Sequence, residues 1–441
     1  MHASPLRVAP WLLTAAFCLA APLRAQEPGP TWAAMADLSE ARGRHSATLL
    51  ANGTVLIAGG QDVAGRPLAA SEIYDPATGI YSPLASPLPM PLWGHTAARL
   101  DDGTVLIAGG NGEGGLPVAD AQLFDPAAAA FIRVGYMSTP RSQHTGMLLG
   151  DGRVLLAGGT DGATAVARLE LYDPAARTIS PAPSALLAPR QNHIATRLID
   201  GRVLIAGGSN SSGMVGTAEL YDPSSGTVAT ARVLNVAREL ASGATLLDGT
   251  VLVAGGRSAE NLDLDMAEVY SPVANTFTLV PALMSTARSG HLGVQLLHNG
   301  KVLIAGGTNA GQLVANAEVY DPVTGAFRTV ESPTTARQLF AANFFYRTPA
   351  SCSPPADSTA LRPRSPPPSL PPQRGSSQAA PRSTVFSSAV CKSGRGSSPR
   401  GPAQPGEIFK PCCSAPQCSV SRRTSMSRAR RAAVPGTQMG A

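Results

Sequence analysis

The chain has 441 residues, of which only 5% are aromatic, whereas glycine and proline are abundant at 45 and 39 residues. This composition is typical of strand-rich proteins with many turns and disfavours long helices. The formal net charge is +6, but thirteen basic and two acidic residues after position 350 contribute +11, so residues 1–350 carry −5. The positive excess is therefore confined to the C-terminal part, and the sequence predicts no nucleic-acid partner for the rest.

The first 25 residues have the pattern of a secretory signal peptide. Arg7 precedes a short apolar stretch at 8–21, and Ala25 suits the cleavage position. This stretch is too short to span a bilayer comfortably, so we expect no stable membrane insertion. A lipid anchor on Cys18 is disfavoured because Phe17 stands where such a site needs a small residue. The pattern predicts export to the periplasm or the outside of the cell.

From residue 31 onward one unit of about fifty residues repeats. Its clearest mark is a Gly-Gly pair that recurs every 48 to 51 residues, at 59–60, 109–110, 158–159, 207–208, 255–256 and 306–307. A fixed period of this length indicates a repeat architecture. No cysteine lies between residues 19 and 351, so this region must be stabilised by its core and topology without disulfides.

Each repeat predicts four strands. A short apolar run ends at an Asn-Gly or Asp-Gly pair, such as Asn52-Gly53, which predicts a tight hairpin turn of type I′. The next run, 55–58 in the first repeat, is continuously apolar, as expected for a strand buried on both faces. A variable loop follows the Gly-Gly pair. A third strand then ends in Tyr-Asp-Pro, a turn signal, and a fourth, outer strand carries an aromatic or aliphatic residue such as Tyr81.

The Gly-Gly pair, a Tyr about fourteen residues later and an aromatic seven further on resemble the kelch repeat, over residues 31–346. The resemblance implies an all-β, kelch-type β-propeller of four-stranded antiparallel blades over residues 26–348. Six blades would be complete. An incomplete seventh would be split between the termini, with a fourth strand at 31–36, marked by Trp32, and a first strand within 336–345. One departure is the absence of the outer-strand Trp that is usual in kelch blades.

Residues 349–441 change character. They are rich in Pro, Ser and Arg and have no periodic apolar pattern, which predicts a disordered low-complexity tail. Arginine greatly outnumbers lysine throughout the chain, as GC-rich coding would give. We therefore hypothesise that this tail is a frameshift product that replaces the rest of the seventh blade. Another reading frame of the locus should then encode a Gly-Gly and Tyr-Asp-Pro unit.

Histidine recurs at one repeat position, before the first strand, in five of the six repeats, while Ala241 stands there in the fifth. A ring of histidines suggests a metal site, but residues related by rotation around a propeller need not converge. The sequence favours a structural role, with hydrogen bonds between blades, and predicts no metal and no cofactor. The five residues are His45, His95, His144, His193 and His291.

Arginine recurs three positions before the histidine, and Leu92 replaces it in the second repeat. One interpretation is a ring at the mouth of the central channel that binds carboxylates or acidic peptides. The alternative, which repetition from blade to blade favours, is a set of ion pairs with the repeated glutamates at 72, 170, 219, 268 and 318. The candidate binding residues are Arg42, Arg141, Arg190, Arg238, Arg288 and Arg337.

The variable loops after the Gly-Gly pairs are where specificity is expected on a rigid repeat scaffold. They contain no nucleophile with its base, phosphate-binding motif or metal-ligand cluster. The sequence favours a monomeric binding or scaffold module for a protein, peptide or glycan. The alternative is a carbohydrate-active enzyme, a cofactor-free isomerase or mutarotase. A copper-radical oxidase that resembles galactose oxidase is disfavoured, because that chemistry uses a tyrosine crosslinked to a cysteine and two histidines.

Overall fold

The computed structural model describes residues 36–333, 342–346 and 384–388. Three predicted features lie outside these residues or at their edge: the signal peptide at 1–25, the strand at 31–36 with Trp32, and Arg337. All of the predicted tail except 384–388 also lies outside them. In the described part, no helix is long and apolar enough to cross a membrane.

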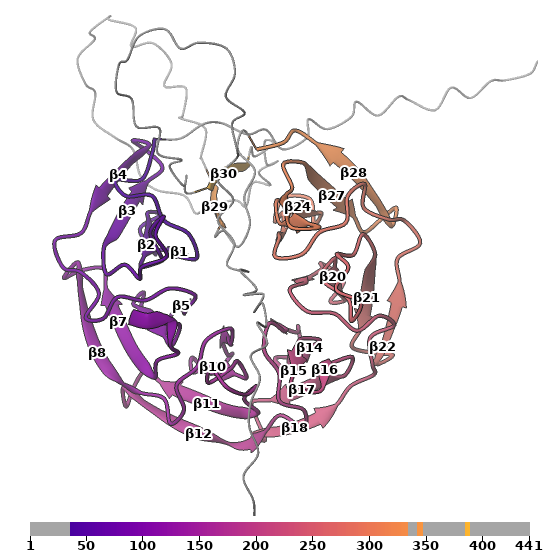
Figure 1. Ribbon diagram of the computed structural model, residues 1–441, viewed down its shortest axis with the longest axis horizontal. Helices are drawn as coiled ribbons and strands as arrows, with labels where there is room; N and C mark the ends of the chain where they lie inside the picture. Colours follow the sequence, from indigo (N-terminus) through magenta and orange to yellow (C-terminus); the bar gives the residue numbers. More distant parts are fainter. Residues whose placement is uncertain (1–35, 334–341, 347–383, 389–441) are drawn as a thin grey trace, which may run out of the picture. The chain divides into compact units, whose positions relative to one another are not determined.

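Six antiparallel four-stranded sheets follow one another around a ring, which confirms the predicted propeller. Their first strands lie toward the centre, and their fourth strands form the outer rim (Figure 1). Blade 1 contains β1 (Ser46–Leu49), β2 (Val55–Ala58), β3 (Ser71–Asp75) and β4 (Ile80–Pro83). Blade 2 contains β5 (Thr96–Arg99), β6 (Val105–Ala108), β7 (Asp120–Asp125) and β8 (Ala130–Tyr136), with a short 3-10 turn, η1 (Glu113–Gly115). Blade 3 contains β9 (Thr145–Leu148), β10 (Val154–Ala157), β11 (Arg168–Asp173) and β12 (Thr178–Ala185).

Blades 4 and 6 each add a small hairpin in the loop after the Gly-Gly pair. Blade 4 contains β13 (Ile194–Arg197), β14 (Val203–Ala206), β17 (Ala218–Asp222) and β18 (Thr227–Thr230), with the hairpin β15 (Ser209–Asn210) and β16 (Gly213–Met214). Blade 5 contains β19 (Ser242–Thr245), β20 (Val251–Ala254), β21 (Ala267–Ser271) and β22 (Thr276–Leu279). Blade 6 contains β23 (Leu292–Gln295), β24 (Val302–Ala305), β27 (Ala317–Asp321) and β28 (Ala326–Val330), with the hairpin β25 (Thr308–Asn309) and β26 (Gln312–Leu313).

The hairpin between the first two strands differs in one detail from the prediction. In blade 1, Leu49 pairs with Val55, and the Leu50 amide donates to the Thr54 carbonyl, so the loop has three residues. Only Gly53 has a positive φ, of 84°, whereas a type I′ turn would need one at Asn52 as well. A three-residue loop that ends in a left-handed glycine satisfies the same Asn-Gly signal.

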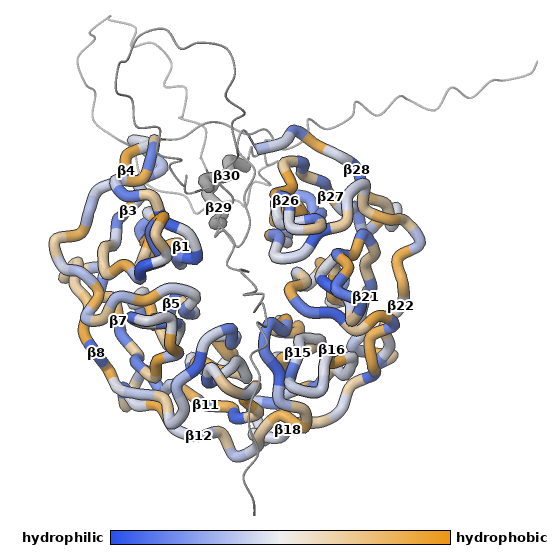
Figure 2. Tube along the Cα trace, viewed as in Figure 1, coloured by the Kyte–Doolittle hydropathy of each residue, from blue (hydrophilic) through white to orange (hydrophobic). Residues whose placement is uncertain are grey.

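The second strand of every blade is buried along its whole length, as its continuous apolar sequence predicts. Figure 2 shows hydrophobic segments recurring in each blade between hydrophilic turns. Five core clusters each combine residues of two successive blades, so the core lies between the sheets. Each buried aliphatic side chain contributes about 2 kcal/mol, so the stability of a blade depends on its neighbours.

The incomplete seventh blade is present as a short pair of strands. β29 (Ala342–Tyr346) contacts β1, as the other first strands contact one another, and pairs with β30 (Thr384–Ser388). β29 confirms the predicted first strand. β30 falls within the segment 349–441, which the sequence predicts to be a low-complexity tail. Two remaining clusters, around Val55 in blade 1 and Leu303 in blade 6, contain described residues of one blade only.

Candidate functional site

The five described arginines of the predicted binding ring are almost completely buried. Arg190 is representative: its guanidinium donates to the Gly207 carbonyl at 2.9 Å, the Thr217 carbonyl at 2.7 Å and Glu219 Oε1 at 2.6 Å. The pairs Arg42–Glu72, Arg141–Glu170, Arg238–Glu268 and Arg288–Glu318 repeat this arrangement. This is the ion-pair alternative, and it places the five guanidinium groups out of reach of a ligand.

These arginines join each blade to the linker that precedes it. The Arg190 amide donates to the Val166 carbonyl, and its carbonyl accepts from Gly159, both in blade 3. Its side chain is bonded to blade 4. Burial lowers the pKa of the Arg190 guanidinium, and the charge of Glu219 opposes that shift. The repeated Arg–Glu pair therefore fixes the angle between successive blades, which explains why it recurs.

Four of the five histidines hydrogen-bond between blades, as the structural interpretation predicts, whereas neither ring nitrogen of His45 has a hydrogen-bond partner among the described residues. Nε2 of His95, His144, His193 and His291 lies 2.8 to 3.1 Å from a Ser or Thr hydroxyl at the start of the preceding blade's first strand. At the one junction without a histidine, Ala241 packs in the cluster that contains Ile194, which replaces the hydroxyl residue. Both members of the polar pair are thus replaced together by apolar residues. Burial lowers the pKa of these imidazoles to about 3 or 4.

The two positions between the repeated arginine and histidine lie just before the first, innermost strand of each blade, on the face of the Gly-Gly loops, where the sequence predicts the channel mouth. The first pairs with the residue after the Gly-Gly of its own blade, as Ser142 does with Thr160. At four of the five junctions between the six blades, the amide of the second position donates to the carbonyl of its counterpart in the preceding blade, as Asn192 does to Gln143 and Leu240 to Asn192. These bridges confirm that both sets of loops share one face. The second position is held by Arg44, Gly94, Gln143, Asn192, Leu240 and Gly290.

All six residues of this mouth ring have a left-handed backbone, with φ between 53° and 64°. Glycine adopts this conformation freely, whereas for other residues it is less favourable by about 1 kcal/mol. Blades 2 and 6 use glycine here, so the fold does not require a side chain. Four blades nevertheless carry one. Strain that the fold could avoid with glycine indicates a functional role for these side chains. The sequence patterns alone did not single them out.

The side chains around the mouth differ from blade to blade. The Arg44 guanidinium lies 4.7 Å from the centre of the Trp93 ring, between blades 1 and 2. Between blades 4 and 5, Glu239 Oε2 accepts from Asn192 Nδ2 at 2.9 Å and from Ser209 Oγ at 2.7 Å. The mouth therefore presents a cation on an aromatic ring in one sector and amides around a carboxylate in another. Such an arrangement suits a polar ligand that several hydrogen bonds orient.

Comparison with known families agrees with this geometry. The family model described as the Kelch motif matches residues 241–284 and 296–334, which contain blades 5 and 6. This match and the six-bladed arrangement support a kelch-repeat propeller family. The matched segments include the Gly-Gly pairs and the Tyr at the end of the third strand, which are the features that the other blades repeat.

A solved structure shares the kelch propeller fold. It is described as a novel fungal alcohol oxidase with catalytic diversity among the AA5 family, in complex with copper, and it aligns with a TM-score of 0.57. The identity is 16%, over 71% of this chain and 70% of that one, so the likeness concerns the fold alone. No curated protein matches the sequence.

The residues of this kelch propeller do not fit a copper-radical site. No cysteine lies between residues 19 and 351, so none is available for a crosslink to a propeller tyrosine. Within the described residues, no group of three or more His, Cys, Asp or Glu side chains could hold a metal ion. The repeated histidines are buried between blades and do not converge.

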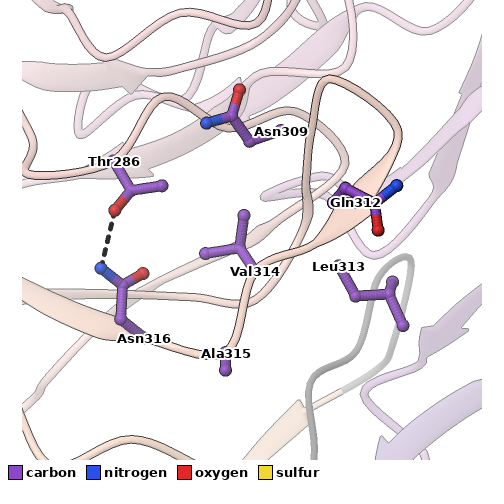
Figure 3. A pocket seen from close by; sticks show the side chains of 7 residues that line it. All are labelled: Thr286, Asn309, Gln312, Leu313, Val314, Ala315 and Asn316. Atoms are coloured by element: carbon purple, nitrogen blue, oxygen red, sulfur yellow. Dashed lines mark hydrogen bonds between the residues drawn. The ribbon is translucent and has the colours of Figure 1, made fainter.

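A cleft of about 410 Å³ lies beside the β25–β26 hairpin of blade 6. Figure 3 shows its lining, in which the Asn316 amide donates to the Thr286 hydroxyl at 2.8 Å. In the other blades, the carbonyl at the repeat position of Ala315 accepts a bond from the linker to the next blade, as Ala119 does from Met137. The corresponding linker beyond Pro333 lies outside the described residues. By its position in the repeat, the cleft corresponds to the place where each of the other blades binds the linker to the next blade. We therefore assign no ligand to it.

Blade 2 has lost both members of the Arg–Glu pair, since Leu92 and Gln122 replace them. Gln122 is fully buried, and neither its Oε1 nor its Nε2 has a hydrogen-bond partner. We expect Leu92→Arg and Gln122→Glu each to destabilise the fold by about 3 kcal/mol, because each buries an unpaired charge. Together they should restore the pair, and stability should return to within about 1 kcal/mol of the parent. Urea unfolding of the four proteins gives the coupling energy. If the losses of unfolding free energy in the two single variants simply add up in the double variant, the prediction is wrong.

Proposed function

We propose that this kelch propeller is an exported binding module whose ligand site is the channel mouth on the Gly-Gly-loop face. The observation that carries the proposal is the mouth ring. Its backbone is fixed by bonds between blades, and its side chains vary and are kept at a conformational cost. A rigid frame with variable polar side chains provides preorganised recognition. The signal peptide pattern supports export.

The ligand that suits this mouth is a polar chain, a glycan or an acidic peptide. Arg44 and Trp93 offer a charged edge and a ring face, which can bind a carboxylate or stack on a sugar ring. Gln143 is exposed, and Asn192 is half-buried beside Glu239, so both can reach hydroxyl or amide groups of a ligand. The described residues offer no particular support for catalysis at this mouth, so we propose binding.

Glycine substitutions in the mouth ring test the proposal. The full-length exported protein would be screened against arrays of glycans and acidic peptides, and a bound compound would then be titrated by calorimetry. We expect Gln143→Gly and Asn192→Gly each to weaken binding about tenfold or more, as loss of hydrogen bonds to a bound ligand does. The melting temperature of Gln143→Gly should stay the same or rise, because glycine relieves the left-handed strain. Asn192→Gly also removes the bond to Glu239 and should melt somewhat lower.

Arg177→Gly is the matched control. Arg177 is also left-handed, with a φ of 54°, but lies in the Asp-Pro turn on the opposite face. It should change neither affinity nor melting by more than the error of measurement. Equal loss of affinity in all three variants, or none in the first two, would place the site elsewhere. Turnover of a bound sugar would favour the carbohydrate-active alternative.

A further inference from the structure

The chain contains three Asn-Gly pairs, which begin at Asn52, Asn111 and Asn299. Asparagine followed by glycine loses ammonia readily without an enzyme, because glycine has no side chain to shield the backbone nitrogen that attacks the asparagine amide. The reaction also needs a backbone that can turn this nitrogen toward Cγ, and water to complete it. The pairs are identical in sequence, so their surroundings in the fold decide which of them reacts.

The pair at Asn111 is held in the interior. Asn111 is 4% exposed, its amide donates to the Trp93 carbonyl at 2.8 Å, and it forms a second bridge with Pro117. The attacking nitrogen would be that of Gly112, which donates to the Leu116 carbonyl at 2.9 Å. Attack would break these bonds in a place that water does not reach. The folded protein therefore protects this pair.

The pair at Asn299 lies in the turn between β23 and β24 of blade 6 and is partly protected. Gly300 is buried, and its amide donates to the Leu296 carbonyl at 2.8 Å. A Cβ placed on Gly300 would lie 2.5 Å from Leu247 Cδ1, so blade 5 crowds this residue. Asn299 Oδ1 accepts one bond, from the Lys301 amide at 3.1 Å.

The pair at Asn52, in the turn between β1 and β2, is open. Asn52 is exposed, and no atom lies within 4 Å of a Cβ placed on Gly53. The Gly53 amide donates to the Leu50 carbonyl at 3.1 Å, the longest bond of the three attacking nitrogens. Asn52 Oδ1 accepts from the Thr54 amide at 3.1 Å and from the Thr54 hydroxyl at 2.8 Å. Two donors on this oxygen stabilise the negative charge that develops there during attack on Cγ.

We infer that Asn52 is the site at which the folded protein deamidates spontaneously. The Gly53 nitrogen gives up its proton and bonds to Asn52 Cγ. The Cγ–Nδ2 bond then breaks, and Nδ2 takes up a proton and leaves as ammonia, which closes a cyclic succinimide. Water opens the ring at one of its two carbonyl carbons and gives aspartate or isoaspartate. The reaction adds a negative charge to blade 1, and it does not depend on what the channel mouth binds.

The two products differ in what they do to the fold. Aspartate already occupies this turn position in blades 2 to 5, and Asp102 Oδ1 accepts from the Thr104 amide at 2.9 Å as Asn52 does from Thr54. Isoaspartate instead inserts a methylene group into the main chain. The short loop that sets the pairing of Leu49 with Val55 is then lengthened. Aspartate should therefore be neutral, whereas isoaspartate should weaken the first hairpin of blade 1.

Timed incubation of the folded, full-length protein at mildly alkaline pH tests the inference. Peptide mass mapping follows the exchange of nitrogen for oxygen at each pair. Asn52 should convert at least about fivefold faster than Asn299, which is the effect of about one hydrogen bond on a rate. Asn111 should stay intact. In the urea-unfolded chain, the three pairs should convert at similar rates. An Asn52 that stays intact, or that leads equally in the unfolded chain, overturns the inference.

Asn52→Asp is the matched control. It should release no ammonia from residue 52 and should melt at the temperature of the fresh parent, because it copies the turn of Asp102. Parent protein aged until isoaspartate has formed at residue 52 should melt below both. If the aged protein contains isoaspartate there and still melts with Asn52→Asp, the structural effect assigned to this product is wrong.

Discussion

Lowering the pH from 7 to 5 is expected to destabilise this kelch propeller by several kcal/mol. Five buried histidines have pKa values lowered to about 3 or 4, chiefly because burial disfavours the charged imidazolium. In the unfolded chain each returns to a pKa of about 6.5. Between these values only the unfolded state takes up protons, so stability is full above pH 6.5 and is lost as the pH falls toward 4.

The expected size is about 2 kcal/mol per histidine at pH 5, since each pKa unit corresponds to 1.36 kcal/mol. Urea unfolding at a series of pH values measures the slope of the unfolding free energy, which gives the number of protons taken up on unfolding. A stability that is flat between pH 7 and 5 would contradict the prediction.

The junction between blades 4 and 5 provides the control, because it already has the apolar pair Ile194 and Ala241. Importing this pair at the junction before it, as Thr145→Ile with His193→Ala, removes the 3.0 Å hydrogen bond and the buried imidazole together. The double variant should fold at pH 7 and take up about one proton fewer on unfolding in acid. An unchanged slope would show that His193 does not contribute to acid sensitivity.

Arg190→Ala is expected to cost about 3–5 kcal/mol, because it leaves the Glu219 carboxylate buried without its counter-charge. It also removes the guanidinium donors to the Gly207 and Thr217 carbonyls, which hold the linker from blade 3 onto blade 4. Thermal or urea unfolding at pH 7 measures the loss. If Arg190 bound a ligand instead, the substitution would abolish binding and leave melting unchanged.

The double variant Arg190→Leu with Glu219→Gln tests the physical cause. It copies the pair that blade 2 already contains, Leu92 and Gln122. Because no buried carboxylate is left unpaired, it should be more stable than Arg190→Leu alone by about 2 kcal/mol or more. A double variant that is less stable than the single one would mean that the bonds which Glu219 accepts from the Leu187 and Ala188 amides, and not its unpaired charge, dominate.

The sequence alone determined the architecture, because its signals are local and repeat six times. Short continuous apolar runs such as 55–58, bounded by turn signals, predict strands buried on both faces, and Asn-Gly and Asp-Pro pairs favour turns. The period of the Gly-Gly pairs then gave the number of blades. The same logic favoured hydrogen bonds between blades for the histidines, which the structure confirms for four of the five.

Only the tertiary structure decided which residues are accessible. The repeated arginines could have been ligands at the channel mouth or partners of the repeated glutamates. Repetition favoured the ion pairs but could not decide between the two, because sequence spacing does not report burial. The fold places Arg190 between two carbonyls and Glu219, fully buried. It places Gln143 and Asn192, which no repeated pattern singles out, on the ring around the mouth. The Asn-Gly pairs are identical in sequence, and only the fold exposes Asn52 in a hairpin loop while it buries Asn111 between backbone bridges.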